Sequence, residues 1–322
     1  MNKNLKMKII NPINQANLFG YDEYFLDFVY KFNNKNIPNV ILFSVLRGTG
    51  KSTFIYHLIN YILSAKEKEK YILKSYKINT DSPTYKHIIN GTHPNFFLIE
   101  NSEGENTIKI DEIRKLQQFI AKTSYRDNYK IVVINNAEYL NINSSNALLK
   151  TLEDPNENTF FFIIHNSSFK ILSTIKSRCH LYNIFFNRSS KERVLKEILN
   201  QYNYKIDTSK IFDLFPYETP GNLINYFLLS YDPENNININ IKESIFEFID
   251  KNERSKNFEF IYYLSILIEN YYRKLFTNVE NDINLSNYKY NKILQLIYNV
   301  KKYNLSEKNL LLSIKNIIRN ER

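Results

Sequence analysis

Short apolar runs alternate with amphipathic stretches over the first 186 positions of this 322-residue chain. The runs are rich in β-branched and aromatic residues and are too short for helices, so they predict buried strands. We expect these strands at residues 40–44, 96–100, 130–135, 160–165 and 181–186. Because helical patterns separate the strands, the sequence predicts a parallel, doubly wound α/β sheet.

The strand pattern stops after residue 187, and helical patterns continue to the end of the chain. A helix is expected to begin at Ser189 or Ser190, and further helices are expected at 221–230 and from Lys242 onward. The stretch 231–240 is rich in asparagine and predicts a break. These patterns predict three domains, at residues 1–186, 187–240 and 241–322.

Composition adds only a few constraints. Lys and Arg number 43 against 33 Asp and Glu, which gives a net charge of +10. That excess suits an anionic partner such as nucleic acid, although a solvated, lysine-rich surface explains it equally well. The single cysteine, Cys179, excludes an internal disulfide and a four-cysteine zinc site. No apolar run reaches the length of a membrane span, so we expect a cytoplasmic protein with no membrane partner.

Residues 43–53 carry the main chemical motif and read F-S-V-L-R-G-T-G-K-S-T between a predicted strand and a predicted helix. This order is typical of a phosphate-binding loop, G-x-x-x-x-G-K-[ST], whose backbone N–H groups, helix N-terminus and lysine bind phosphate. The residues that fit are Gly48, Gly50, Lys51, Ser52 and Thr53. Ser52 would bind magnesium. Val45 stands where the pattern requires its first glycine, so the sequence predicts an altered nucleotide site.

The strand after this loop also lacks the residues that hydrolysis needs. In a nucleotide hydrolase its end carries an aspartate that positions magnesium and a glutamate that polarises water, but here it ends in Asn135 and Asn136. Asparagine has no charge and cannot take a proton from water. Glu138 lies two residues further on, and we interpret it as a surface or capping residue rather than a displaced base. We therefore expect no ATP hydrolysis by this chain alone.

The most specific motifs lie further along the chain. Residues 146–155 read N-A-L-L-K-T-L-E-D-P, and residues 177–179 read S-R-C. Both blocks resemble bacterial clamp-loader subunits of the AAA+ superfamily, which carry N-A-L-L-K-x-L-E-E-P followed by S-R-C. Within that superfamily the chain is similar to delta-prime subunits of DNA polymerase III. The altered loop, the missing acidic residues, and residues 91–95 (G-T-H-P-N, similar to G-x-H-P-D) favour this assignment. The resemblance covers about residues 11–230.

The resemblance implies an AAA+ phosphate-loop-type sheet domain, a small helical lid and an all-α C-terminal collar for assembly. It implies a stator subunit that does not hydrolyse ATP and helps load the sliding clamp on primed DNA. Arg178 of the S-R-C block would reach the ATP site of an adjacent subunit as an arginine finger, and a salt-bridged arginine at a helix end is the alternative. The implied partners are gamma/tau-like ATPase subunits, the delta subunit, the sliding clamp and primer–template DNA.

Several positions depart from the family pattern. Pro220 and Gly221 are present, but Asn222 replaces the arginine that senses the γ-phosphate in hydrolysing members. The zinc module of many relatives is absent, so we expect no zinc and no other metal site. Lys51 and its neighbours survive, which allows weak binding of ATP, ADP or phosphate, but no cofactor is required.

The candidate DNA contacts are Lys109, Arg114 and Lys115, near the start of a predicted helix. They could face phosphates in the central chamber of a ring, and a solvated helix face explains them equally well. Two other functions stay open from the sequence. One is an active ATPase motor subunit of the same complex, and the other is a stand-alone DNA-binding protein on a degenerate AAA+ scaffold.

Overall fold

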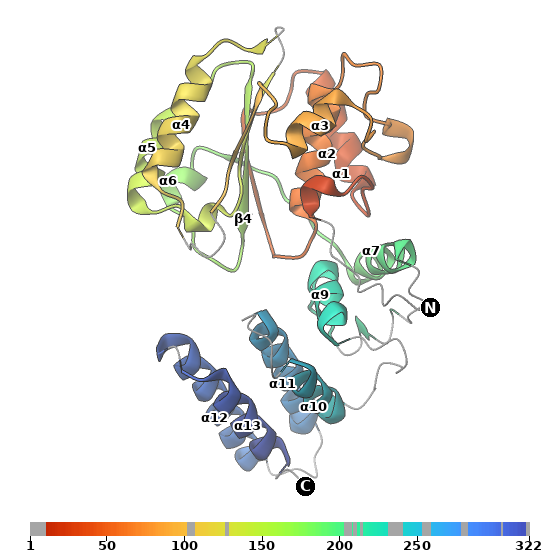
Figure 1. Ribbon diagram of the computed structural model, residues 1–322, viewed down its shortest axis with the longest axis vertical. Helices are drawn as coiled ribbons and strands as arrows, with labels where there is room; N and C mark the ends of the chain where they lie inside the picture. The colour runs from red at the N-terminus through yellow and green to blue at the C-terminus, as the bar shows by residue number, and fades with distance from the viewer. Residues whose placement is uncertain are drawn as a thin grey trace. The chain divides into compact units, whose positions relative to one another are not determined.

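The computed structural model describes residues 11–101, 107–125, 129–202, 208, 211–212, 215–230, 241–252, 259–277, 283–303 and 305–319 (Figure 1). The chain forms two compact units. One is built around Ile9–Thr208 together with Thr219–Asn222, and the other around Ser209–Glu218 and Leu223–Arg322. The predicted domain boundaries near residues 186 and 240 stay predictions.

The first unit contains a five-stranded sheet in the order β2-β3-β4-β1-β5, in which every pair of neighbours is parallel. The strands are β1 (Val40–Val45), β2 (Phe96–Ile99), β3 (Lys130–Ile134), β4 (Thr159–Asn166) and β5 (His180–Leu181). All five residues of β3 and seven of the eight in β4 are buried, as expected of strands covered on both faces. The predicted parallel α/β sheet is confirmed.

Helices cover both faces of the sheet (Figure 1). The first face packs on α1 (Asp22–Asn33), α2 (Lys51–Leu63) and α3 (Pro83–Ile89), and the second on α4 (Ile110–Ala121), α5 (Ile142–Glu153) and α6 (Ser173–Lys176). Short 3₁₀ helices occur at Pro12–Asn14, Leu73–Ser75 and Ala137–Tyr139. Successive strand residues alternate between the two cores, since Phe43 belongs to the first and Leu42 to the second.

The last predicted strand is shorter than expected. The sequence predicts extension over 181–186, but pairing ends at β5, His180–Leu181. After it, Tyr182 N–H still donates to the Leu42 carbonyl at 3.0 Å, whereas further along the Tyr24 hydroxyl of α1 accepts the N–H of Phe185 at 2.8 Å and donates to its carbonyl at 2.9 Å. The backbone of Phe185 is therefore engaged by a side chain and takes no part in the strand ladder.

The first residue of β3 caps the C-terminal end of α4. Lys130, its first residue, is only 5% exposed, and its Nζ donates to the carbonyls of Phe119 at 2.9 Å, Ile120 at 3.0 Å and Lys122. Carbonyls in the last turn of a helix have no partner within the helix, so this ammonium satisfies the C-terminal end of α4. Burial lowers the pKa of Lys130, and Lys122 adds to that effect.

Helices make up the described remainder of the chain. They are α7 (Arg188–Gln201), α9 (Pro220–Ser230), α10 (Ile241–Asn252), α11 (Glu259–Thr277), α12 (Ile283–Tyr303) and α13 (Glu307–Arg319). Fully buried residues such as Ile245, Phe260 and Ile314 form the apolar faces that the sequence predicts. The expected break at 231–240 lies outside the described residues. Among the described helices, none is long and apolar enough to serve as a membrane span.

Candidate functional site

The loop between β1 and α2 has the backbone that its glycines predict. Gly48 and Gly50 have φ angles of +82° and +89°, a region that other residues adopt only with strain. Gly50 is the N-cap of α2, and Lys51 and Ser52 begin the helix. The N-terminus of a 13-residue helix therefore lies at the loop, as in a phosphate site.

Lys51 is directed at its own loop. Its side chain is buried, and its Nζ donates to the carbonyls of Val45 at 2.8 Å and Leu46 at 3.2 Å. Burial lowers the pKa of Lys51 to about 8, the nearby carboxylate of Glu138 partly opposes this change, and Arg47 adds to it. A phosphate at this loop would have to compete with two backbone carbonyls for the ammonium group.

The start of α9 packs directly against the same loop. Gly221 N–H donates to the Gly48 carbonyl at 2.8 Å, and the Thr219 hydroxyl donates to the Arg47 carbonyl at 2.8 Å. A Cβ at Gly48 would lie 2.3 Å from Thr219 Oγ1, and a Cβ at Gly221 would lie 2.7 Å from the Gly48 carbonyl oxygen. Both glycines are therefore needed for this approach. Asn222, at the position of the missing sensor arginine, is buried beside Gly48.

The two asparagines at the end of β3 bind the end of β2. Asn135 Nδ2 donates to Glu100 Oε2 at 3.2 Å, and Asn136 Nδ2 donates to Asn101 Oδ1 at 3.1 Å. Asn136 also has a positive φ of +55°, a conformation that asparagine tolerates better than most residues. These amides bind side chains that follow β2 and supply no base for water activation.

Two further side chains lie at this edge. Glu138 Oε2 accepts the backbone N–H of Asn166 at 3.1 Å, in agreement with the capping interpretation. Because Asn166 pairs with Val45 of the loop, Glu138 lies close to the loop, and its charge acts on Lys51 and His165. His165 Nδ1 lies 2.9 Å from Ser44 Oγ, and burial lowers the pKa of this histidine. In the sequence, His165 stands at the end of the fourth predicted strand.

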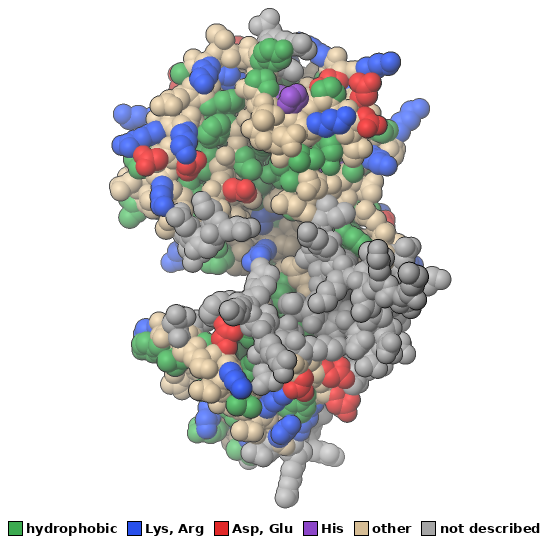
Figure 2. Space-filling model, in the orientation of Figure 1, with side chains coloured by type: hydrophobic (Ala, Val, Ile, Leu, Met, Phe, Trp, Pro, Cys, Tyr) green, Lys and Arg blue, Asp and Glu red, His purple; other side chains and the backbone are tan. Residues whose placement is uncertain are grey.

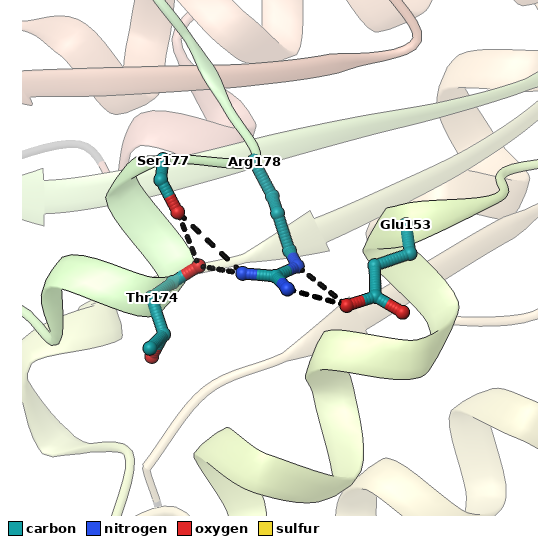
Figure 3. Close-up of polar contacts among 4 residues, drawn as sticks. All are labelled: Glu153, Thr174, Ser177 and Arg178. Atoms are coloured by element: carbon teal, nitrogen blue, oxygen red, sulfur yellow. Dashed lines mark hydrogen bonds and ion pairs between the residues drawn. The ribbon is translucent and has the colours of Figure 1, made fainter.

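Arg178 follows α6 and is bound by its own chain (Figure 3). Its Nε and Nη2 donate to Glu153 Oε1 at 2.8 and 2.5 Å, and Nη1 donates to the Thr174 carbonyl at 3.0 Å. The side chains of Arg178 and Glu153 are 32% and 51% exposed. The structure thus joins the two motif blocks that the sequence singled out. The ion pair of the alternative interpretation is present, and the role in trans stays a prediction.

Cys179 is a half-buried structural residue. Its Sγ donates to the Ile175 carbonyl at 3.1 Å, and burial raises the pKa of the thiol to about 12. A thiol whose pKa is raised by burial stays protonated at neutral pH and is a poor nucleophile. Within the described ranges, His, Cys, Asp and Glu side chains form no group of three or more that could hold a metal ion, and the expectation of no zinc stays a prediction.

The candidate DNA contacts are solvent-exposed and partly neutralised. Lys109 is the N-cap residue of α4, Arg114 pairs with Asp111 at 2.9 Å, and Lys115 pairs with Glu112 at 2.6 Å. On the face drawn in Figure 2, lysine and arginine side chains are scattered, with acidic side chains among them. A role in DNA binding stays a prediction for all three basic residues.

Comparison with known proteins identifies relatives of this chain. The DNA polymerase III subunit delta' of Pseudomonas aeruginosa is 42% identical over 89 residues, which are 28% of this chain and 27% of that protein. The protein of the same name from Escherichia coli K12 is 28% identical over 144 residues, 45% of this chain and 41% of the relative. This chain therefore matches less than half the length of these relatives. The resemblance to delta-prime subunits is confirmed by these matches.

A solved structure of a DNA polymerase III gamma subunit-related protein from Thermotoga maritima aligns over 91% of this chain and 98% of its own, with a TM-score of 0.44 and 19% identity. The family model described as DNA polymerase III, delta subunit, matches residues 21–187, just over half of the chain. The matched segment holds the phosphate loop, the asparagine pair and the Glu153–Arg178 pair. The chain therefore belongs to the DNA polymerase III delta subunit family that this model describes.

Proposed function

We propose that this chain is a stator-like, non-hydrolysing subunit of the replicative clamp loader. It would help load the sliding clamp on primed DNA and supply Arg178 to the ATP site of a neighbouring subunit. The observation that carries the proposal is the guanidinium of Arg178, which lies at the surface in a defined orientation. The chain's membership of a DNA polymerase III family and its delta' relatives support the same assignment.

The chemistry at the phosphate loop supports the absence of hydrolysis. Hydrolysis needs a carboxylate that orients magnesium and water, but Asn135 and Asn136 bind the end of β2 with neutral amides. Lys51, the cation that would reach the phosphates, binds the carbonyls of its own loop. Weak binding of ATP, ADP or phosphate by the loop remains part of the proposal, and no cofactor is needed for the stator role.

An arginine supplied by an adjacent chain suits the reaction in that chain's site. Negative charge spreads over the transferring phosphoryl oxygens, and a planar, permanently charged guanidinium binds two of them at once. In other phosphoryl-transfer systems such a finger raises the rate by about 10³–10⁵-fold. The proposed partners are gamma/tau-like ATPase subunits, the delta subunit, the sliding clamp and primer–template DNA, with the α10–α13 helices as the collar and the cytoplasm as the location.

The decisive experiment is reconstitution with the ATPase subunits in a complex where only the site next to this chain can hydrolyse ATP. We expect Arg178→Ala to lower turnover at that site by about 10³-fold without preventing assembly. Arg188→Ala is the matched control, because Arg188 is also exposed and paired with a glutamate, Glu192 at 2.8 Å. Normal turnover with Arg178→Ala would exclude the finger role, and appreciable ATP turnover by the purified chain alone would exclude the stator role.

A further inference from the structure

The guanidinium of Arg178 is only partly used by its own chain. Arginine has five N–H donors. One on Nε and one on Nη2 bind Glu153 Oε1, and one on Nη1 binds the Thr174 carbonyl. Ser177 Oγ lies 3.5 Å from Nη1, at the limit of a hydrogen bond. Among the described residues, the second N–H of Nη2 thus has no acceptor, and Nη1 makes only a long contact with Ser177, which a phosphoryl oxygen can replace, so the guanidinium can offer two donors to a phosphoryl group.

The acceptors lie on opposite sides of the guanidinium (Figure 3). Glu153 is the last residue of α5, and Thr174 belongs to α6. Helix α5 is fixed by Leu148 and Leu152, whose side chains are buried in the second core. The carboxylate of Glu153 is therefore attached to a well-packed helix. It binds the edge of the guanidinium that Nε and Nη2 form.

We propose that Glu153 is the positioning residue for Arg178: its carboxylate fixes the guanidinium so that the remaining donors face a phosphoryl group of the adjacent subunit. This inference rests on the proposed function. An arginine side chain has many rotamers, and restricting it before the phosphate arrives removes part of the entropy cost from the reaction. Glu153 does not contact the reacting atoms and acts only through Arg178.

The expected effect is modest because the pair is partly exposed. Exposed ion pairs contribute little free energy, which corresponds to about a twofold to fivefold change in a rate or equilibrium. Loss of orientation acts on the transition state and not on ATP binding, so it lowers kcat and leaves KM unchanged. Purely structural damage would instead lower the stability of the chain and its incorporation into the complex.

The test uses the reconstituted complex in which only the adjacent site is active, with kcat and KM for ATP measured. Glu153→Ala should lower kcat about twofold to fivefold at constant KM. Glu153→Gln should restore most of it, because the amide oxygen accepts the same two donors. Glu153→Asp keeps the charge but is one methylene shorter, so it should behave like the alanine variant and replaces it if that variant does not fold. Glu192→Ala serves as the control.

Double variants separate positioning from other roles. Adding Glu153→Ala to Arg178→Ala should cause no further loss, because Glu153 acts through the guanidinium. Normal kcat in both the alanine and aspartate variants, a glutamine variant as slow as the alanine variant, or a full additional loss in the double variant would each overturn the positioning role. If Arg178→Ala itself leaves turnover unchanged, the proposed function fails first, so the two failures are distinguishable.

Discussion

Lys51 offers a direct measurement of the state of the phosphate loop. Burial lowers its pKa from 10.5 to about 8, so the folded protein releases this proton more readily than the unfolded chain does. The unfolded state therefore binds more protons between these two values, and stability rises with pH across that interval. Below pH 8 the charged Lys51 imposes its full cost on folding, and the cost disappears as the pH approaches 10.5.

The magnitude follows from the two pKa values. A gap of about 2.5 pH units corresponds to about 3 kcal/mol of folding free energy at pH 7 and about 2 kcal/mol at pH 9. Lys51→Met removes the titrating group and also the hydrogen bonds to Val45 and Leu46, but the loss of the hydrogen bonds is nearly independent of pH. The stability difference between wild type and Lys51→Met should therefore change by about 1 kcal/mol between pH 7 and pH 9, in favour of the wild type.

Urea denaturation of both proteins at pH 7, 8 and 9 measures this difference, and tyrosine ionisation cancels between them. A difference that does not change with pH would show that Lys51 keeps an ordinary pKa in the folded chain and would refute the reasoning. Repeating the series with millimolar ATP tests the loop itself. A bound phosphate would favour the charged lysine and remove the pH dependence, whereas a vestigial loop leaves it in place.

Two further predictions concern the loop's packing and the basic residues of α4. Gly48→Ala should lower the free energy of unfolding by about 1–3 kcal/mol more than Gly91→Ala, because both have positive φ but only the Cβ at Gly48 meets other atoms. Equal losses in urea denaturation would contradict the close approach of α9. Joint replacement of Lys109, Arg114 and Lys115 by alanine should reduce the salt dependence of DNA binding by the complex, by about one unit of slope for each phosphate that is no longer bound. Fluorescence anisotropy across salt concentrations measures this slope, and an unchanged slope would favour the solvated-face interpretation.

The sequence predicted the central features of the sheet unit because they depend on local patterns. Continuous apolar runs identified β1, β3 and β4, and the glycine spacing identified the loop whose φ angles require Gly48 and Gly50. The prediction for the fifth strand is too long, and the contact that engages its far end is tertiary. A hydroxyl from Tyr24, which is 161 positions away, binds both backbone groups of Phe185, and no pattern near residue 185 indicates it.

The sequence identified the residues of the candidate site but not the contacts that they make. Arg178 stood out through the S-R-C block, whereas its ion pair joins the turn after α6 to Glu153 at the end of α5, 25 residues earlier in the chain. Likewise, the loop motif identified Lys51 but not the carbonyls that it binds. The approach of Gly221 to Gly48 depends on how the chain returns to the sheet unit after α7. Each of these contacts depends on the tertiary fold, and local sequence patterns do not predict such contacts.

The hydrogen bonds of Lys130 to the last carbonyls of α4 affect how this helix moves. The ammonium of Lys130 ties the last carbonyls of α4 to strand β3, which is paired with β4 from Lys130 to Ile134. A helix end held in this way frays less readily, because its last carbonyls have a partner on a buried strand. The 12 residues of α4 form a continuous helix about 18 Å long at 1.5 Å per residue. A force applied near Lys109 would thus be transmitted along α4 to strand β3.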